Sequence, residues 1–130
     1  MKSNSEPFES EVIQRLTELC DIAGPHFVHE LIELFFKMGR KDFDLMKYAV
    51  AHSSQKSSID KFRHGARSLK ATSFNLGANA LGLACEEAEA LSLVESKSKL
   101  ADSVHKIESH LIMTEDYLRE YVQESQSSAS

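Results

Sequence analysis

Several residue types are scarce in this chain, and each shortage narrows what the protein can be. The 130 residues include two prolines, two cysteines, five glycines and no tryptophan. Cys20 and Cys85 stand far apart in sequence, so no CxxC metal or redox motif is present, and we expect both to be buried as small hydrophobic residues. No apolar run approaches the roughly 20 residues of a membrane span, and the first residues lack the apolar stretch of a signal peptide. We therefore expect a cytoplasmic protein that is not inserted in a membrane.

Positive charge is also in short supply. Asp and Glu number 20 against 15 Lys and Arg, which gives a net charge of -5. This balance argues against general nucleic-acid binding, because such proteins need a surplus of cations to displace phosphate counterions. The length fits a single domain, and a hydrophobic content of 42% can supply its core. We expect one monomeric domain on which any basic patch is local.

Apolar residues recur at spacings of three and four, which is typical of helices, and no segment alternates with period two. The spacing predicts a short first helix that stops at Gly24-Pro25, then four long helices, of which the third runs from about Ile59 to Leu76. The second helix should bury Phe27, Val28, Leu31, Leu34, Phe35, Met38, Leu45, Met46 and Ala49. We predict an all-α fold, an up-and-down four-helix bundle with a short additional N-terminal helix, over residues 9–123. Residues 1–8 should be a flexible N-terminus and 124–130 a disordered tail.

The third of these helices has a basic outer face. At about 100° per residue, Phe62, Ala66, Leu69, Ser73 and Leu76 share one stripe. His64 and Arg67 fall on the opposite side, and the small residues Gly65, Ala66 and Ala71 leave room for another molecule to approach. A solvated charged face would explain the pattern equally well without a motif. As a partner-binding surface, the face would comprise Lys61, Arg63, His64, Arg67, Ser68, Lys70, Ala71, Phe74 and Asn75.

A motif on the same helix favours the functional interpretation. It reads Ala66-Arg67-Ser68-Leu69-Lys70-Ala71-Thr72-Ser73, then Leu76-Gly77-Ala78, then Leu81, Cys85 and Glu89 at intervals of four. This pattern resembles the signature of histidine-phosphotransfer (HPt) domains. The resemblance implies a helical phosphorelay module that accepts a phosphoryl group from a receiver-domain aspartate onto an exposed histidine and passes it to another receiver. Its partners would be receiver domains of response regulators or hybrid histidine kinases.

Arg67 occupies the position of the family's phosphorylated histidine, and Ala71 replaces the family's common glycine. A guanidinium stays protonated and has no nucleophilic lone pair, so Arg67 can bind phosphate but cannot carry it. The resemblance assigns Lys70 to the attraction of phosphate. Two origins of Arg67 remain open: a natural pseudo-phosphotransfer protein, or a variant of an active one. In both cases charge-assisted hydrogen bonds to a receiver's acidic pocket would preserve docking.

Two alternatives remain. His64 lies about one helical turn, some 5 Å, from Arg67 and could be the phospho-acceptor of an active phosphocarrier, although transfer needs reacting atoms near 3 to 3.5 Å. Alternatively, the chain is a plain helical scaffold or dimerisation domain.

The sequence indicates no conventional enzyme, at most a phosphotransfer intermediate, and we expect no cofactor. We also expect no metal, because His26 and His29 lack a third ligand. We interpret the acidic residues Glu86, Glu87, Glu89 and Glu95 as a solvated face.

Overall fold

The structure is a computed structural model that describes residues 2–52, 56–92 and 97–129, with side chains placed for 10–52, 57–92 and 98–125. Within these ranges the chain forms helices and no strands, which confirms the all-α prediction. The helices are α1 (Lys2–Ala23), α2 (Pro25–Ala51), α3 (Lys56–Asn75), α4 (Asn79–Leu91) and α5 (Lys97–Ala129).

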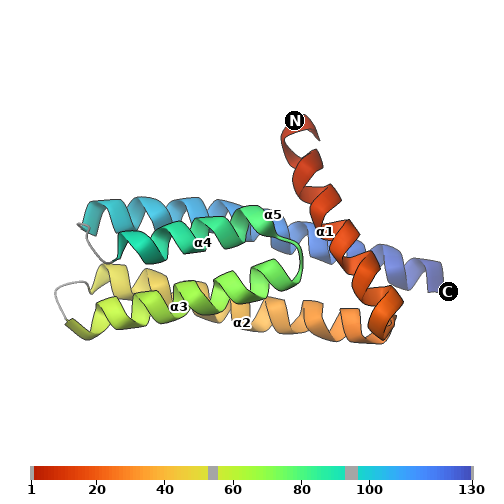
Figure 1. The fold of residues 1–130 in the computed structure, drawn as a ribbon, viewed down its shortest axis with the longest axis horizontal. Coiled ribbons are helices and arrows are strands. Elements are labelled where there is room, and N and C mark those ends of the chain that lie inside the picture. Colours follow the sequence, from red (N-terminus) through yellow and green to blue (C-terminus); the bar gives the residue numbers. More distant parts are fainter. Residues whose placement is uncertain (1, 53–55, 93–96, 130) are drawn as a thin grey trace.

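Helices α2 to α5 run side by side along the long axis of the molecule, whereas α1 crosses them at a steep angle (Figure 1). Helix α3 packs between α2 and α4, and α5 packs against both α2 and α4. The C-terminal part of α1 lies on α2 and touches α4, while its N-terminal part projects away from the other helices.

Glycine and proline shape the turns at Gly24-Pro25 and at Gly77. Gly24 separates α1 from α2 with φ 92°, and its N–H donates to the Cys20 carbonyl at 2.8 Å. Pro25 then opens α2, where the missing N–H has no cost. Gly77 has φ 78° after α3; its N–H donates to the Phe74 carbonyl, and that of the next residue donates to Ser73. This is a Schellman cap, and it confirms the predicted end of the third helix.

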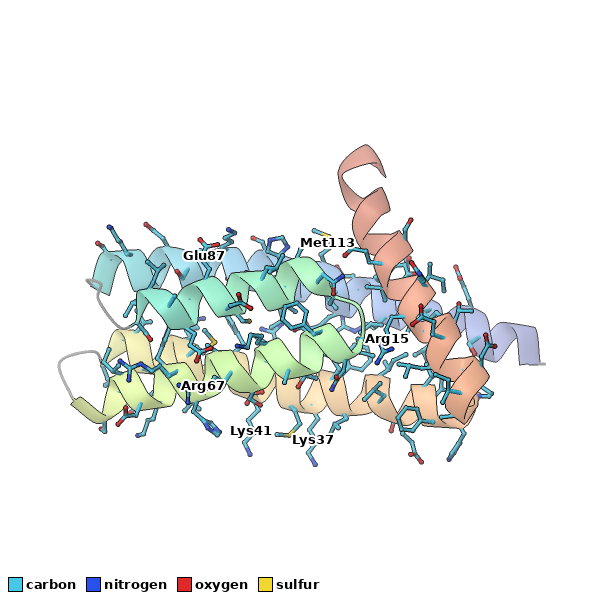
Figure 2. The ribbon with its side chains drawn as sticks, in the orientation of Figure 1. Arg15, Lys37, Lys41, Arg67, Glu87 and Met113 are labelled. Atoms are coloured by element: carbon cyan, nitrogen blue, oxygen red, sulfur yellow. The ribbon has the colours of Figure 1, made fainter. Side chains whose placement is uncertain are left out.

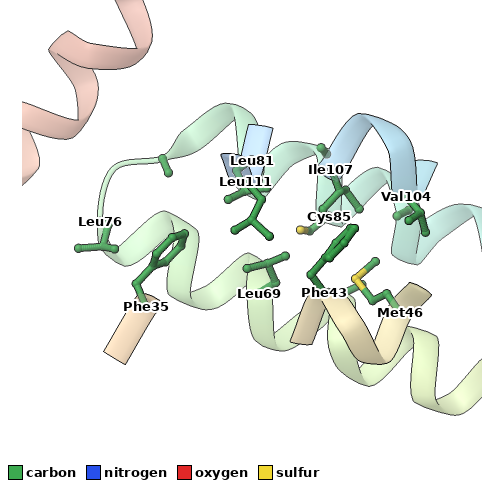
Figure 3. Packing of buried hydrophobic residues seen from close by; sticks show 14 of the residues in the cluster. Phe35, Phe43, Met46, Leu69, Leu76, Leu81, Cys85, Val104, Ile107 and Leu111 are labelled. Atoms are coloured by element: carbon green, nitrogen blue, oxygen red, sulfur yellow. The ribbon is translucent and has the colours of Figure 1, made fainter. Parts of the chain in front are cut away.

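All five helices contribute to one core, and Figure 3 shows the part of it between α2, α3, α4 and α5. The stripe predicted for the third helix is buried in full, as are the α5 residues spaced at four and three from Leu100 to Leu118. Ser73 and Thr114 lie within these stripes, and each hydroxyl donates to the carbonyl four residues earlier, at 2.6 and 2.7 Å. These bonds satisfy polar groups that would otherwise be costly to bury. Cys85 is fully buried as expected, whereas Cys20 is only half-buried.

The prediction for the second helix was wrong in part. Phe27 and Leu34 are exposed, with 41% and 51% of their surface accessible. The buried stripe of α2 is rotated about the helix axis from the predicted apolar face, because α3 and α5 cover α2 on the side that this stripe faces. It consists of Val28, Ile32, Phe35, Gly39, Asp42, Phe43, Met46 and Ala49.

The ends of the chain also differ from the prediction. The first helix is not short: it has 22 residues and begins at Lys2, within the segment 1–8 predicted to be flexible. Helix α5 continues to Ala129, through most of the segment 124–130 predicted to be disordered. A formed helix adds one hydrogen bond for each further residue, so it extends readily past its packed part. At the C-terminal end, His29 Nε2 lies 3.1 Å from Ser125 Oγ and ties α5 to α2.

Candidate functional site

The outer face of α3 is the candidate site. Besides Ser57 and Asp60 in its first two turns, the helix exposes Lys61, His64, Arg67, Ala71 and Asn75, because α2 and α4 cover its two inner flanks. These residues recur at three or four and form one row along the helix. The predicted face also included Arg63, Ser68, Lys70 and Phe74, which are half-buried. In Figure 2 the labelled Arg67 lies on the same side of the molecule as Lys37 and Lys41 of α2, whereas Glu87 lies along the opposite edge. Lys37 and Lys41 are exposed, so the basic surface extends from α3 onto α2.

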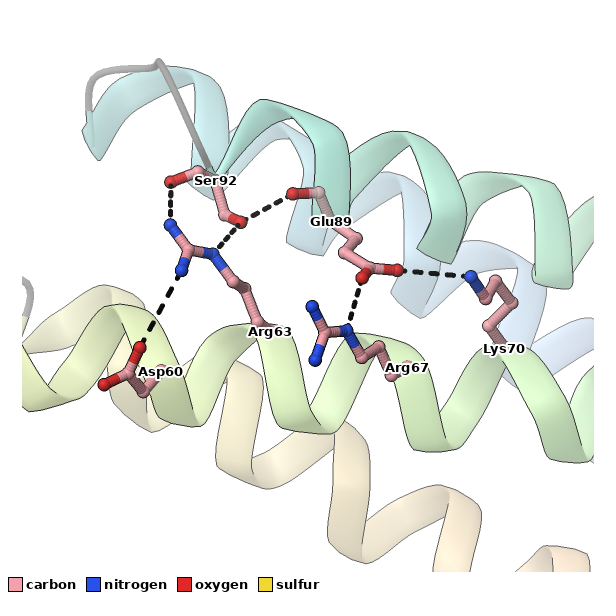
Figure 4. Close-up of polar contacts among 6 residues, drawn as sticks. All are labelled: Asp60, Arg63, Arg67, Lys70, Glu89 and Ser92. Atoms are coloured by element: carbon pink, nitrogen blue, oxygen red, sulfur yellow. Dashed lines mark hydrogen bonds and ion pairs between the residues drawn. The ribbon is translucent and has the colours of Figure 1, made fainter.

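Arg67 and Lys70 both bind one carboxylate on the neighbouring helix (Figure 4). Arg67 Nε donates to Glu89 Oε2 at 2.5 Å, and Lys70 Nζ donates to Glu89 Oε1 at 3.2 Å. Glu89 therefore places one oxygen on each cation, and the three side chains tie α3 to α4. Hydrogen bonds from Arg67 in the first place, and from Lys70, lower the pKa of Glu89. The carboxylate is thus held ionised between the two cations.

These three partners differ in how much they meet solvent. The side chain of Arg67 remains 66% exposed, compared with 30% for Lys70 and 20% for Glu89. Within the described residues, no hydrogen bond or ion pair engages the terminal Nη1 and Nη2 atoms of Arg67. The site therefore offers solvent mainly the end of the Arg67 guanidinium. The prediction that Glu89 belongs to a solvated acidic face is wrong, while Glu86 and Glu87 are exposed as predicted.

Arg63 points along the helix interface rather than outward. Its Nε donates to Ser92 Oγ at 3.0 Å, and Nη2 reaches the Ser92 carbonyl at 3.4 Å, just after the last residue of α4. A weaker contact of 3.8 Å joins Nη1 to Asp60. Lys61 extends toward the Tyr48 ring, with Nζ 5.9 Å from the ring centroid. Arg63 thus holds α3 and α4 together, and Lys61 remains an exposed cation at the edge of the face.

Phe74 and two of the small residues lie elsewhere than predicted. Phe74 is half-buried over Gly82 of α4, where an added Cβ would come within 2.6 Å of the ring. Gly65 and Ala66 are buried, and a Cβ on Gly65 would lie 2.7 Å from Met46 and 2.8 Å from the Asp42 carbonyl oxygen. Their small size allows α2 and α3 to pack closely rather than leaving room for a partner. Of the three small residues Gly65, Ala66 and Ala71, only Ala71 is exposed.

Asp42 is a residue that the sequence reasoning missed. It is 5% exposed on α2, and its Oδ2 atom is the one buried side-chain oxygen or nitrogen in the described part of the chain without a hydrogen-bond partner. Burial raises the pKa of Asp42, while the neighbouring Ser68 hydroxyl, His64 and Lys41 oppose that change. A buried carboxyl therefore lies beneath the part of α3 that carries Ser68 and His64. One pattern in the sequence could have indicated this burial: Asp42 lies at spacings of three and four from positions 32, 35, 39 and 46, which are buried on α2.

Outside the α3 face, the described residues carry further His, Cys, Asp and Glu side chains. No group of three or more His, Cys, Asp and Glu side chains there is placed to hold a metal ion. His26 pairs with Glu30 at 3.1 Å, and His29 contacts Ser125. None of the described helices is both long and apolar enough to cross a membrane. Glu95, which the acidic cluster was predicted to include, lies outside the described residues.

Comparison of the chain with protein-family models, curated proteins and solved structures found no match.

Proposed function

We propose that this protein is an HPt-like module, a four-helix bundle with an additional N-terminal helix, that docks receiver domains through α3 without carrying phosphate at the usual position. The observation that carries the proposal is the location of Arg67. The residue at the motif's histidine position is 66% exposed in the middle of the row on α3, with Lys70 one turn away. The motif therefore coincides with an accessible surface, which a chance match on a buried helix would not provide.

The charge of the surface supports the kind of partner proposed. Arg67, Lys61, Lys37 and Lys41 present cations on one side of a chain whose net charge is -5. A receiver is phosphorylated on an aspartate in an acidic pocket, so its charge complements this surface. Complementary charge steers association and fixes the relative orientation of two proteins. Arg67 would then enter the position that the phosphohistidine occupies in an active family member.

Docking is tested by titrating a panel of receiver domains from the source organism into the full chain and measuring Kd by calorimetry. For a receiver that binds, Arg67→Glu should weaken binding at least about tenfold, because it replaces an attractive charge with a repulsive one. Arg119→Glu is the matched control, since Arg119 on α5 is 59% exposed and also pairs with one acid, Asp116. Equal effects of the two substitutions would argue against docking through α3, and binding of none of the receivers would favour the scaffold interpretation.

Relay is tested with a receiver phosphorylated by radiolabelled acetyl phosphate. The unmodified chain should acquire no acid-labile label, because a guanidinium cannot act as the acceptor. Arg67→His should acquire it, since this change restores a nucleophile at the motif position. An Arg67→His chain that folds and binds the receiver but stays unlabelled would contradict the assignment of position 67.

A second candidate function is phosphotransfer through His64. It is favoured by one observation: His64 is exposed and lies close enough to the Asp42 carboxyl for the two to interact electrostatically. A nearby carboxylate can orient an imidazole and stabilise the cation that it becomes. Label on the unmodified chain that disappears in His64→Gln would establish this function in place of the first.

A further inference from the structure

Arg67 uses only one side of its guanidinium within the protein. The Nε atom donates to Glu89, while Nη1 and Nη2 have no hydrogen bond within the described residues and belong to a side chain that is 66% exposed. We infer that Glu89 positions Arg67 so that its Nη1/Nη2 pair receives the carboxylate of a receiver aspartate, and that the protein therefore selects receivers in the unphosphorylated state. This inference rests on the proposed function, and it adds a positioning residue and a preference between two states of the partner.

The geometry of the guanidinium argues for a carboxylate. A guanidinium is planar and rigid, so a bond at Nε fixes the plane in which the two terminal amino groups lie. Two parallel N–H groups in one plane match the two oxygens of a carboxylate, and such a paired contact is stronger and more directional than a single bond. Glu89 is itself held in place by Lys70, since each of its oxygens has its own donor. The exposed end of Arg67 is therefore oriented before a partner arrives.

The charge of the group argues against a phosphoryl ligand. A phosphoryl group carries about two negative charges and three acceptor oxygens, so it needs several donors from different directions. Lys70 is a second cation at Glu89, but its Nζ donates to that carboxylate at 3.2 Å. Arg67 and Lys70 together with the ionised Glu89 leave a single net positive charge. One positive charge and one planar pair of donors suit a carboxylate better than a phosphoryl group.

Space around Arg67 permits the contact. Ala71 lies one turn further along the same exposed row, and its side chain is a single methyl group. Asn75 follows at the next turn, and its backbone carbonyl accepts a bond from Arg15 of α1 at 3.0 Å. The C-terminal end of α3 is thus fixed by α1 while the surface beside Arg67 stays accessible.

The test compares two states of a receiver that binds the full chain: the unphosphorylated domain, and the same domain with beryllium fluoride bound to its aspartate as a phosphoryl mimic. The unmodified chain should bind the first at least about tenfold more tightly. Glu89→Gln releases Lys70 and adds one net positive charge, so it should shift this ratio toward the mimic by about tenfold. Glu87→Gln is the control, because Glu87 is exposed on the same helix and pairs with Lys106 instead; it should leave the ratio unchanged.

A second measurement examines the positioning without any partner. In the free protein, NMR should show the Arg67 Nε–H protected from exchange with water, and Glu89→Ala should remove that protection. Equal or tighter binding of the mimic to the unmodified chain, an unchanged ratio in Glu89→Gln, or an unprotected Nε–H would each overturn the inference while leaving docking intact. A protected Nε–H with no receiver bound in either state would instead overturn the proposed function, and the inference with it.

Discussion

Two glycines with left-handed backbone allow the seating of α1 to be measured. Gly24 and Gly77 have φ values of 92° and 78°, so alanine at either position is strained. Their surroundings differ: a Cβ on Gly24 would meet nothing within 4 Å, whereas one on Gly77 would lie 2.7 Å from the Glu11 carbonyl oxygen and 2.8 Å from Arg15 Cβ. Both of these atoms belong to α1. Gly24→Ala therefore measures the backbone strain alone, and Gly77→Ala measures the strain together with the collision.

The magnitudes follow from these contacts. Left-handed backbone costs an alanine roughly 1–2 kcal/mol, and the lower entropy of the unfolded alanine chain returns about 0.4–1 kcal/mol at both positions. Overpacking at Gly77 should add about 1–3 kcal/mol, because one contacted atom is backbone and cannot move aside as a flexible side chain does. We expect the free energy of unfolding of Gly77→Ala to be lower than that of Gly24→Ala by this additional amount.

Urea unfolding followed by circular dichroism at 222 nm measures both free energies, provided that the two variants share one denaturant slope. An equal loss in the two variants, within about 0.5 kcal/mol, would contradict the expected collision between a Cβ at position 77 and α1. It would mean that α1 does not rest against the turn between α3 and α4. A change in the denaturant slope of either variant would point instead to altered compactness of its unfolded or native state.

Glu115, Asp42 and Cys85 are ionisable groups buried in the fold. Arg40 donates to Glu115 at 2.6 Å, and the Glu115 side chain is only 7% exposed. Arg40→Ala should therefore lower the free energy of unfolding, measured in urea, by about 2–4 kcal/mol. This is less than for a fully buried pair, because Arg40 is itself 39% exposed. A loss under about 1 kcal/mol would show that the pair behaves as a surface salt bridge. Burial raises the pKa of Asp42 above its ordinary value of 3.8. As pH rises, the Asp42 carboxyl therefore keeps its proton to a higher pH in the native state than in the unfolded chain. The free energy of unfolding should fall as pH passes from 3.8 through the raised native pKa. Unfolding measured from pH 3 to 8 should show this decline, and Asp42→Asn should flatten it; an identical pH profile in that variant would contradict the assignment. Burial also raises the pKa of Cys85 to about 12, so a thiol reagent at pH 8 should modify the half-buried Cys20 first, and mass spectrometry of the first labelled product should locate the adduct there rather than on Cys85.

The parts of the fold that sequence predicted well are those in which one stripe of each helix is covered. In α3 and α5 the apolar residues at spacings of three and four form a single stripe, and that stripe is the buried face. Helix α2 has apolar residues on its exposed side as well as on its buried side. Periodicity alone therefore did not distinguish Phe27 and Leu34, which are exposed, from Ile32 and Phe43, which are buried. The choice between the two stripes depends on where α3 and α5 lie.

The candidate site shows the same limit. Helical geometry placed Arg67 and Lys70 near one another because they are three residues apart on one helix. It did not place Glu89 between them, since that contact crosses from α3 to α4 and depends on how the two helices are aligned. Asp42 was missed for a related reason: an aspartate amid charged neighbours reads as surface, and only packing shows it to be buried. The expectation of receiver docking stays a prediction.

The contact of one carboxylate with both Arg67 and Lys70 has a consequence for how this surface can change. Position 67 faces outward, yet its side chain also fixes the alignment of α3 against α4 through Glu89. A histidine placed there would adjoin the same carboxylate, which would favour its protonated form and reduce the neutral imidazole that attacks a phosphoryl group. Phosphotransfer by a histidine placed at position 67 should therefore increase with pH, and a change of Glu89 to a neutral residue should raise the rate near neutral pH.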